Sequence, residues 1–218
     1  MAEFVFIPGG WYGGWVFEGV ERPLLERGHS VRSVTLSGLG EQPAPAANLS
    51  THVADTVGHL KAADEPVVLC GHSYGGMVIT GAADAVPEKV KALVYLDAYV
   101  PDDGDTTWSL TTPRFRDMFL AGAAENGYAC APPAGLDPRC RPHPIGTFLQ
   151  AVRLTGAWKT VARKIYVGAH GWEDSPFLDL FERLQRHPEW PTLSLDCGHS
   201  IPRHAPERAI EVLLAAAE

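Results

Sequence analysis

The residues most able to do chemistry are gathered in one short stretch, Gly71-His-Ser-Tyr-Gly-Gly76. It follows the apolar run Pro66–Cys70, so the pattern predicts a buried strand, a sharp turn and a helix start. Gly71 and Gly75 flank Ser73, as a strained turn requires where side chains would collide with the strand and the helix. We expect this turn to present the Ser73 hydroxyl as a nucleophile at the edge of a sheet.

Two backbone amides could stabilise negative charge that develops beside this hydroxyl. The N–H of Tyr74 would lie at the predicted helix N-terminus, where unpaired donors and the helix dipole favour an oxyanion. The second N–H could come from Gly10, the turning point of the Gly-rich loop Pro8–Trp15. This loop has neither a GxGxxG pattern nor a P-loop lysine, so a nucleotide site is not expected.

A base is needed to activate the hydroxyl, and nine histidines compete for that role. His199 is the best candidate, because it follows a predicted strand end and a glycine, an arrangement that lets an imidazole hang over the sheet edge. His72 lies beside the nucleophile, but its side chain should point the other way. Four others are expected on the surface or behind the site: His52, His59, His170 and His204.

A carboxylate is needed to hold the tautomer of His199, and two places offer one. Asp97 ends the predicted strand that begins at Lys91. Glu173 and Asp174 lie in a loop after a later predicted strand. We favour Asp97 because a strand terminus places a carboxylate more rigidly than a loop. The structural alternative for Asp97 is a cap of the following turn.

An α/β architecture would bring these groups together. Strand patterns alternate with helix patterns, which predicts a mostly parallel sheet flanked by helices, with functional groups at the strand C-termini. The rhythm is lost between Pro101 and about Val161, where short helical pieces are predicted over Thr112–Ala124 and Ile145–Trp158. A stretch this long is typical of a lid or binding loop, so we expect a small helical cap within one domain of residues 1–218.

Aromatic residues of the cap and of the Gly-rich loop could line an apolar pocket. The candidates are Trp11, Trp108, Phe115, Met118, Phe119, Phe148 and Trp158. Many of them could instead serve only to hold the cap down. The pocket they would form favours a small apolar or aromatic compound over a charged or polymeric one.

Composition excludes several classes of partner. A net charge of −8 is a poor match for nucleic acid or an anionic membrane surface. No apolar run reaches the length of a membrane span and no basic start typical of a signal peptide is present, so we expect a cytoplasmic protein, a monomer or homodimer with a small-molecule substrate. No zinc-binding spacing occurs, and neither a metal nor a cofactor is expected.

The four cysteines fall into two pairs. Cys70 and Cys197 lie next to the predicted chemistry and are expected to be buried thiols. Cys130 and Cys140 lie in a Pro-rich loop and could form a disulfide. A reducing cytosol favours free thiols at both positions.

Over essentially its whole length the chain resembles the α/β-hydrolase superfamily, most closely the compact group that includes plant methyl-ester esterases and hydroxynitrile lyases. The stretches that carry the resemblance are Phe6–Trp15, Gly71–Gly76, Leu96–Pro101, Lys164–Val167 and Gly198-His199. The resemblance implies a Ser73 nucleophile, a His199 base and an oxyanion hole from the backbones of Gly10 and Tyr74.

Three positions depart from the pattern of that group. Pro8 stands where the group usually has histidine, so a side chain near the oxyanion loop is missing while the backbone donor remains. Trp172 comes to the position where the triad aspartate usually lies, which leaves Asp97 or the neighbouring carboxylates for that role. Ser200 stands where hydroxynitrile lyases present a lysine to the leaving cyanide, so cyanohydrin cleavage is not expected.

The reaction expected from these parts is acyl transfer to water. Ser73 would attack the carbonyl of an ester, lactone or thioester while His199 takes its proton, and water would then release the acyl group. Two rivals use the same scaffold: a small-molecule receptor with slow turnover, and a lyase or cyclase in which the two residues act as an acid/base pair. Hydrolysis is favoured because every part that it needs is present.

Overall fold

Six parallel strands form the central sheet in the computed structural model, which describes residues 1–218. Their order across the sheet is β2-β1-β3-β4-β7-β8. The strands are β1 (Glu3–Ile7), β2 (Ser30–Ser33), β3 (Val67–His72), β4 (Val90–Leu96), β7 (Arg163–Ala169) and β8 (Thr192–Leu195). The two central strands, β3 and β4, are apolar and buried along almost their whole length, as strands covered on both faces must be.

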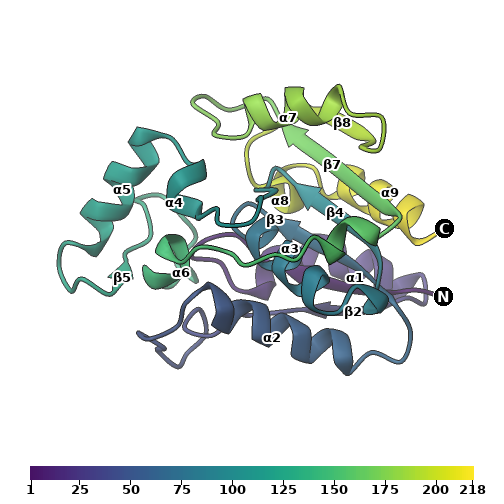
Figure 1. Cartoon of the computed structure of the whole chain (residues 1–218), viewed down its shortest axis with the longest axis horizontal. Helices are drawn as coiled ribbons and strands as arrows, with labels where there is room; N and C mark the ends of the chain where they lie inside the picture. Colours follow the sequence, from purple (N-terminus) through teal and green to yellow (C-terminus); the bar gives the residue numbers. More distant parts are fainter.

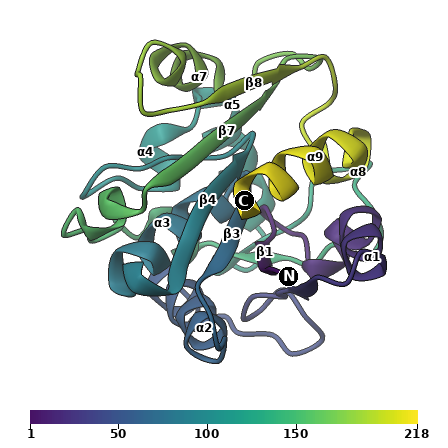
Figure 2. The same cartoon turned by 90° about the vertical axis from the view of Figure 1, so that its right-hand side faces the viewer.

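Helices cover both faces of the sheet (Figure 2). Alternate residues of β1 enter different cores: Phe4 and Phe6 pack towards α1 and α9, whereas Val5 and Ile7 pack towards α2 and α3. The helices are α1 (Glu18–Glu26), α2 (Leu49–Lys61), α3 (Gly75–Ala85), α7 (Leu178–Gln185), α8 (Ile201–His204) and α9 (Pro206–Ala217), with 3₁₀ turns η1 (Gly14–Phe17) and η2 (Pro87–Lys89). The predicted α/β-hydrolase architecture is confirmed.

We call the segment 101–161 the cap. Its residues up to about 149 lie beyond the C-terminal ends of the strands, on the left in Figure 1, and the remainder runs back towards the start of β7. The cap contains α4 (Thr107–Leu110), α5 (Pro113–Ala123), a hairpin of β5 (Ala129–Cys130) with β6 (His143–Pro144), α6 (Gly146–Leu149) and η3 (Ala157–Thr160). Both chain termini lie on the opposite side of the molecule.

The helix predicted over Ile145–Trp158 is wrong for its central part, because other groups take its backbone donors. The N–H of Val152 donates to the Asp105 carbonyl, and that of Leu154 to the Asp103 carboxylate. The Asp84 carboxylate, at the end of α3, accepts from the amides of Thr155, Gly156 and Trp158, as well as from the Thr155 hydroxyl. These bonds tie the returning end of the cap to the helix that follows the Ser73 turn.

All four cysteines are free thiols, so Cys130 and Cys140 are not joined. Cys70 is buried as expected, whereas Cys197 is only partly buried. None of the helices combines the length and the apolar character that a membrane crossing needs.

Candidate active site

Ser73 occupies the turn between β3 and α3 in a left-handed conformation, with φ of 54°. For a residue with a side chain this conformation stores about 1–3 kcal/mol of strain. The flanking glycines make the turn possible by letting backbones touch. A methyl group on Gly71 would lie 2.8 Å from the carbonyl carbon of Gly75, and one on Gly75 would lie 2.5 Å from the carbonyl oxygen of Ile7.

A buried carboxylate holds the imidazole of His199. Asp97 directly follows β4 with φ of 44°, and its side chain is only 1% exposed. Its Oδ2 lies 2.7 Å from Nδ1 of His199 and 3.0 Å from the indole nitrogen of Trp172, and its Oδ1 accepts the N–H of Ala169 at 3.1 Å. An ionised carboxylate can only accept, so Nδ1 carries the proton and the lone pair of His199 is left at Nε2.

The alternative acids lie elsewhere. Glu173 and Asp174 are both exposed, and Asp174 pairs with the guanidinium of Arg114 in the cap. The structure therefore brings Asp97 to His199 and leaves the other two carboxylates outside the site. Trp172, at the position where the related group usually has its acid, donates its indole N–H to Asp97 instead.

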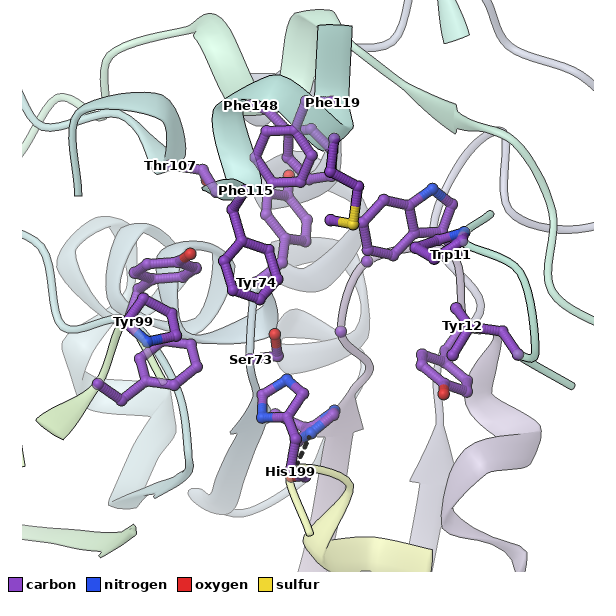
Figure 3. Close-up of a pocket in the computed structure, with 18 of the residues that line it drawn as sticks. Trp11, Tyr12, Ser73, Tyr74, Tyr99, Thr107, Phe115, Phe119, Phe148 and His199 are labelled. Carbon is purple, nitrogen blue, oxygen red and sulfur yellow. Dashed lines mark hydrogen bonds between the residues drawn. The ribbon is translucent and has the colours of Figure 1, made fainter. Parts of the chain in front are cut away.

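Ser73 and His199 lie next to each other at one end of a cavity (Figure 3). Two aromatic rings pack against the imidazole of His199. The ring of Phe177 is stacked on it with a centroid distance of 5.5 Å, and the ring of Trp172 is tilted with a centroid distance of 4.6 Å. The Ser73 hydroxyl has no hydrogen-bond partner in the chain. It is free to turn onto Nε2 of His199 when substrate enters, as catalytic hydrogen bonds commonly do.

His72 also borders the cavity, and its side chain is fully buried. Its ring lies 4.7 Å from the ring of His199. Burial lowers the pKa of His72 well below its usual range, so the ring is neutral. Its Nε2 lies 3.1 Å from the carbonyl oxygen of His199, which accepts the N–H, and the bond fixes the backbone of the loop that carries His199.

The two expected oxyanion donors reach the same cavity from different elements. Gly10 lies in the loop after β1, and Tyr74 precedes the first residue of α3. The N–H groups of both residues make no hydrogen bond within the chain. The loop packs tightly on the Ser73 turn, since a methyl group on Gly9 would lie 2.9 Å from Cβ of Ser73. Both amides are thus available near the nucleophile.

Two buried histidines contact the residues that carry or follow the expected oxyanion donors. His52 is fully buried: its Nδ1 lies 2.9 Å from the phenolic oxygen of Tyr74 and its Nε2 lies 2.8 Å from the carbonyl oxygen of Ser37. His143, in the cap hairpin, accepts the N–H of Trp11 on Nδ1 at 3.1 Å. Sequence reasoning missed His143, because a single histidine in a Pro-rich stretch carries no periodicity or spacing signal.

The cavity between the Ser73 turn and the cap has a volume of about 230 Å³. Five of the seven expected residues line it: Trp11, Phe115, Met118, Phe119 and Phe148. Trp108 and Trp158 do not line it. Trp158 is buried in the core against Trp190, and Trp108 lies beside the guanidinium of Arg116. The helical pieces of the cap were predicted, but the direction of each side chain depends on how those pieces pack.

The cavity wall is apolar and carries no Asp, Glu, Lys or Arg side chain. Besides Ser73 and the two histidines, its polar side chains are the hydroxyls of Tyr12, Tyr74, Tyr99 and Thr107. No three His, Cys, Asp or Glu side chains are grouped so that they could hold a metal ion. The site is therefore suited to uncharged ligands.

Known proteins resemble this chain over its full length. The sequence model of the alpha/beta hydrolase family matches residues 4–212. A carbendazim hydrolyzing esterase from Nocardioides sp. (strain SG-4G) is 34% identical over 240 residues, which cover 99% of each chain. An alpha-hydroxynitrile lyase from Arabidopsis thaliana is 37% identical, but over only 46% of this chain and 41% of that protein.

Among solved structures, an extracellular alpha/beta-hydrolase from a Paenibacillus species superposes with a TM-score of 0.83 over 100% of both chains, at 19% sequence identity. That hydrolase shares structural and functional homology with tobacco salicylic acid binding protein 2. At this identity the superposition establishes the shared fold alone.

Proposed function

Because this chain belongs to the alpha/beta hydrolase family, we propose that Ser73, His199 and Asp97 are the nucleophile, base and acid of an ester-cleaving hydrolase. The protein is a serine hydrolase of the esterase type, since its full-length relative is an esterase. The observation that carries the residue assignment is the 2.7 Å contact between His199 Nδ1 and the buried Asp97 carboxylate, beside a serine in a strained turn.

In the first half-reaction Nε2 of His199 takes the proton of the Ser73 hydroxyl as its oxygen attacks the ester carbonyl carbon. The carbonyl oxygen becomes an oxyanion and accepts the N–H groups of Gly10 and Tyr74. Collapse of this intermediate breaks the bond to the alcohol, which leaves with the proton from His199. Asp97 stays ionised throughout and stabilises the imidazolium by its hydrogen bond to Nδ1.

In the second half-reaction water replaces the departed alcohol. His199 takes a proton from that water as its oxygen attacks the acyl carbon, and the same two amides hold the second oxyanion. Breakage of the bond to Ser73 Oγ releases the carboxylic acid, while the imidazolium returns its proton to the serine. Every proton therefore passes through one nitrogen atom, Nε2 of His199.

The substrate we propose is a small uncharged ester, lactone or thioester with an apolar or aromatic group. The size of the cavity, its apolar wall and its lack of ionised side chains support this class. Carbendazim is included among the candidates because the full-length relative hydrolyses it. We further propose a cytoplasmic location, which the four free cysteines favour, and a monomer or homodimer.

Lyase or cyclase chemistry is the second candidate, because a hydroxynitrile lyase is among the partial relatives. It is less well supported, since Ser200 stands where those lyases present a lysine. A receptor role would require that ligand binds without multiple turnover.

The test is active-site labelling with a fluorophosphonate probe. We expect the wild-type protein to label and Ser73→Ala to lose the label entirely. Asp97→Asn should label slowly, whereas a Glu173→Gln/Asp174→Asn double variant should label at the wild-type rate. A panel of short-chain and aryl esters, with carbendazim included, then defines turnover. A folded wild-type protein that does not label would overturn the hydrolase mechanism and favour the receptor or lyase role.

A further inference from the structure

We propose that His143 is a positioning residue that sets the Gly10 amide of the oxyanion hole by accepting the backbone N–H of Trp11. The inference rests on the proposed function, because it assigns a role within that reaction. It also makes the cap part of the catalytic apparatus, since His143 belongs to the cap strand β6.

The Gly-rich loop has only a long internal hydrogen bond at its turn, from the N–H of Tyr12 to the Gly9 carbonyl at 3.4 Å. Trp11 has φ of 68°, a left-handed conformation that costs a non-glycine residue about 1–3 kcal/mol. The preceding residues Pro8, Gly9 and Gly10 offer no polar side chain that could stabilise the turn. A partner from elsewhere in the chain must therefore supply the stabilisation.

The cap hairpin supplies three hydrogen bonds, all to Trp11. His143 Nδ1 accepts the backbone N–H at 3.1 Å, and the Cys130 carbonyl accepts the indole N–H at 2.9 Å. The carbonyl of Trp11 accepts the N–H of Arg141 at 3.0 Å. Of these bonds, the one to His143 acts on the peptide group that joins Gly10 to Trp11. On the N-terminal side of Gly10, Gly9 packs closely against the Ser73 turn. The Gly10 amide therefore lies between two residues that are each held by contacts with other parts of the chain.

His143 is prepared to accept this bond. Its Nε2 lies 2.8 Å from the Thr147 hydroxyl, which in turn donates to the Pro144 carbonyl at 2.8 Å, so Nε2 carries the proton and Nδ1 the lone pair. Burial lowers the pKa of His143 well below its usual range and keeps the ring neutral. The ring stacks on Phe148 at 4.3 Å with an angle of 4° between the planes, which fixes its orientation.

The first test compares His143→Asn with His143→Leu. Asparagine can place its side-chain oxygen near the position of Nδ1 and accept the Trp11 N–H, whereas leucine cannot. We expect His143→Leu to lower kcat by about 10- to 100-fold with little change in KM, because a misplaced oxyanion donor weakens only the transition state. His143→Asn should retain most of the activity, and the exposed His170→Leu serves as the control.

A transition-state mimic separates this role from a purely structural one. In His143→Leu, affinity for an aryl boronic acid, whose tetrahedral adduct with Ser73 carries an oxyanion, should fall in parallel with kcat/KM. Affinity for the planar carboxylic acid product should not change. Equal losses in both affinities, or equal activity in His143→Leu and the wild type, would overturn the proposal.

A measurement on the unmodified protein covers the case in which His143→Leu does not fold. The ¹⁵N chemical shifts of the His143 ring should show a protonated Nε2 and an unprotonated Nδ1 at neutral pH. A proton on Nδ1 would overturn the proposal, because that nitrogen could not accept the Trp11 N–H. This result does not depend on any substrate. A failure here is therefore distinct from a failure of the esterase assignment, which the loss of labelling in Ser73→Ala tests.

Discussion

The two amides that face the Ser73 hydroxyl are held in opposite ways. Tyr74 is placed by its immediate neighbours: β3 enters the turn, α3 leaves it, and glycines let both backbones close around Ser73. Gly10 is placed by residues far along the chain, because the Trp11 that follows it is bonded to Cys130, Arg141 and His143. One donor is built by local structure and the other by tertiary contact.

This difference indicates which residues of the site could be substituted while the proposed reaction is retained. The sheet side carries the proposed nucleophile, base and acid, Ser73, His199 and Asp97, in the segments that directly follow strands. The loop side depends on the cap, which also contributes a large part of the apolar wall, including Phe115, Phe119 and Phe148. We therefore expect substitutions in the cap to alter substrate fit and oxyanion geometry together, and substitutions of the proposed catalytic residues to lower the reaction rate most.

The largest effect is expected on the sheet side. Asp97→Asn keeps the size of the side chain but can no longer force the proton onto Nδ1 of His199, so kcat should fall by about 10²- to 10⁴-fold. Asp174→Asn, which lies outside the site, is the matched control and should leave kcat unchanged. Steady-state ester hydrolysis measures both. A similar loss in the two variants would mean that the acid has been misassigned.

The next prediction concerns the rigidity of the turn that carries Ser73 and Tyr74. A methyl group on Gly76 would lie 2.0 Å from the Tyr99 carbonyl oxygen and 2.8 Å from the Tyr99 backbone nitrogen, so it would meet backbone rather than a flexible side chain. We expect Gly76→Ala to lower the free energy of unfolding by about 3 kcal/mol or more. Gly58→Ala, in α2 where nothing lies within 4 Å, should raise it by about 0.5–1 kcal/mol. Urea denaturation reads out both, and a tolerant Gly76 would show that the turn can relax.

Acid should lower the free energy of unfolding, because three histidines around the site are buried. Burial lowers the pKa of His52, His72 and His143 below 6.5, so the unfolded chain binds more protons than the folded one at low pH. Stability is then complete above pH 6.5 and falls as the pH drops, by up to about 1.4 kcal/mol per pH unit for each histidine. Urea denaturation between pH 7.5 and 5.5 measures the slope.

His143→Asn should reduce that slope by the contribution of one histidine. A slope that does not change in this variant would mean that His143 is not buried in its neutral form. A flat pH dependence in the wild type would contradict the buried environment of all three rings.

The smallest effect lies in the cap and depends on one hydroxyl. Thr107 is 1% exposed and its Oγ1 has no partner, so the isosteric Thr107→Val should stabilise the protein by about 1 kcal/mol. The same change at the equally buried Thr147 removes the acceptor of the His143 N–H and should destabilise by about 1–3 kcal/mol. Thermal denaturation compares the two. Effects of the same sign would show that hydrogen bonding does not distinguish the two positions.

The same contrast explains what could be predicted from the sequence. The strand before Ser73, the glycines around it, and Asp97 and His199 at strand ends follow from local patterns, and the structure brings them together. The cap does not follow such patterns. Trp158 turned out to pack in the core, and the helix expected around it is replaced by bonds to Asp84.

Residues that act across the fold were the hardest to foresee. Trp172 and His143 lie 75 and 132 residues from the groups that they contact, Asp97 and Trp11. Neither contact leaves a trace in spacing or periodicity, because both are decided by how the cap and the last strands pack. The neutral state of His72 likewise depends on burial that only the folded chain creates.

The position of the chain ends has a practical consequence. The six strands of the central sheet run in the same direction, and the cavity lies at their C-terminal edge. β1 begins at the other edge, and Ala217 in the last helix bonds to Lys91 at the start of β4. Both termini thus emerge on the side away from the cap (Figure 1). Immobilisation through either end would leave the mouth of the cavity facing the solution, and a fused carrier protein would not obstruct it.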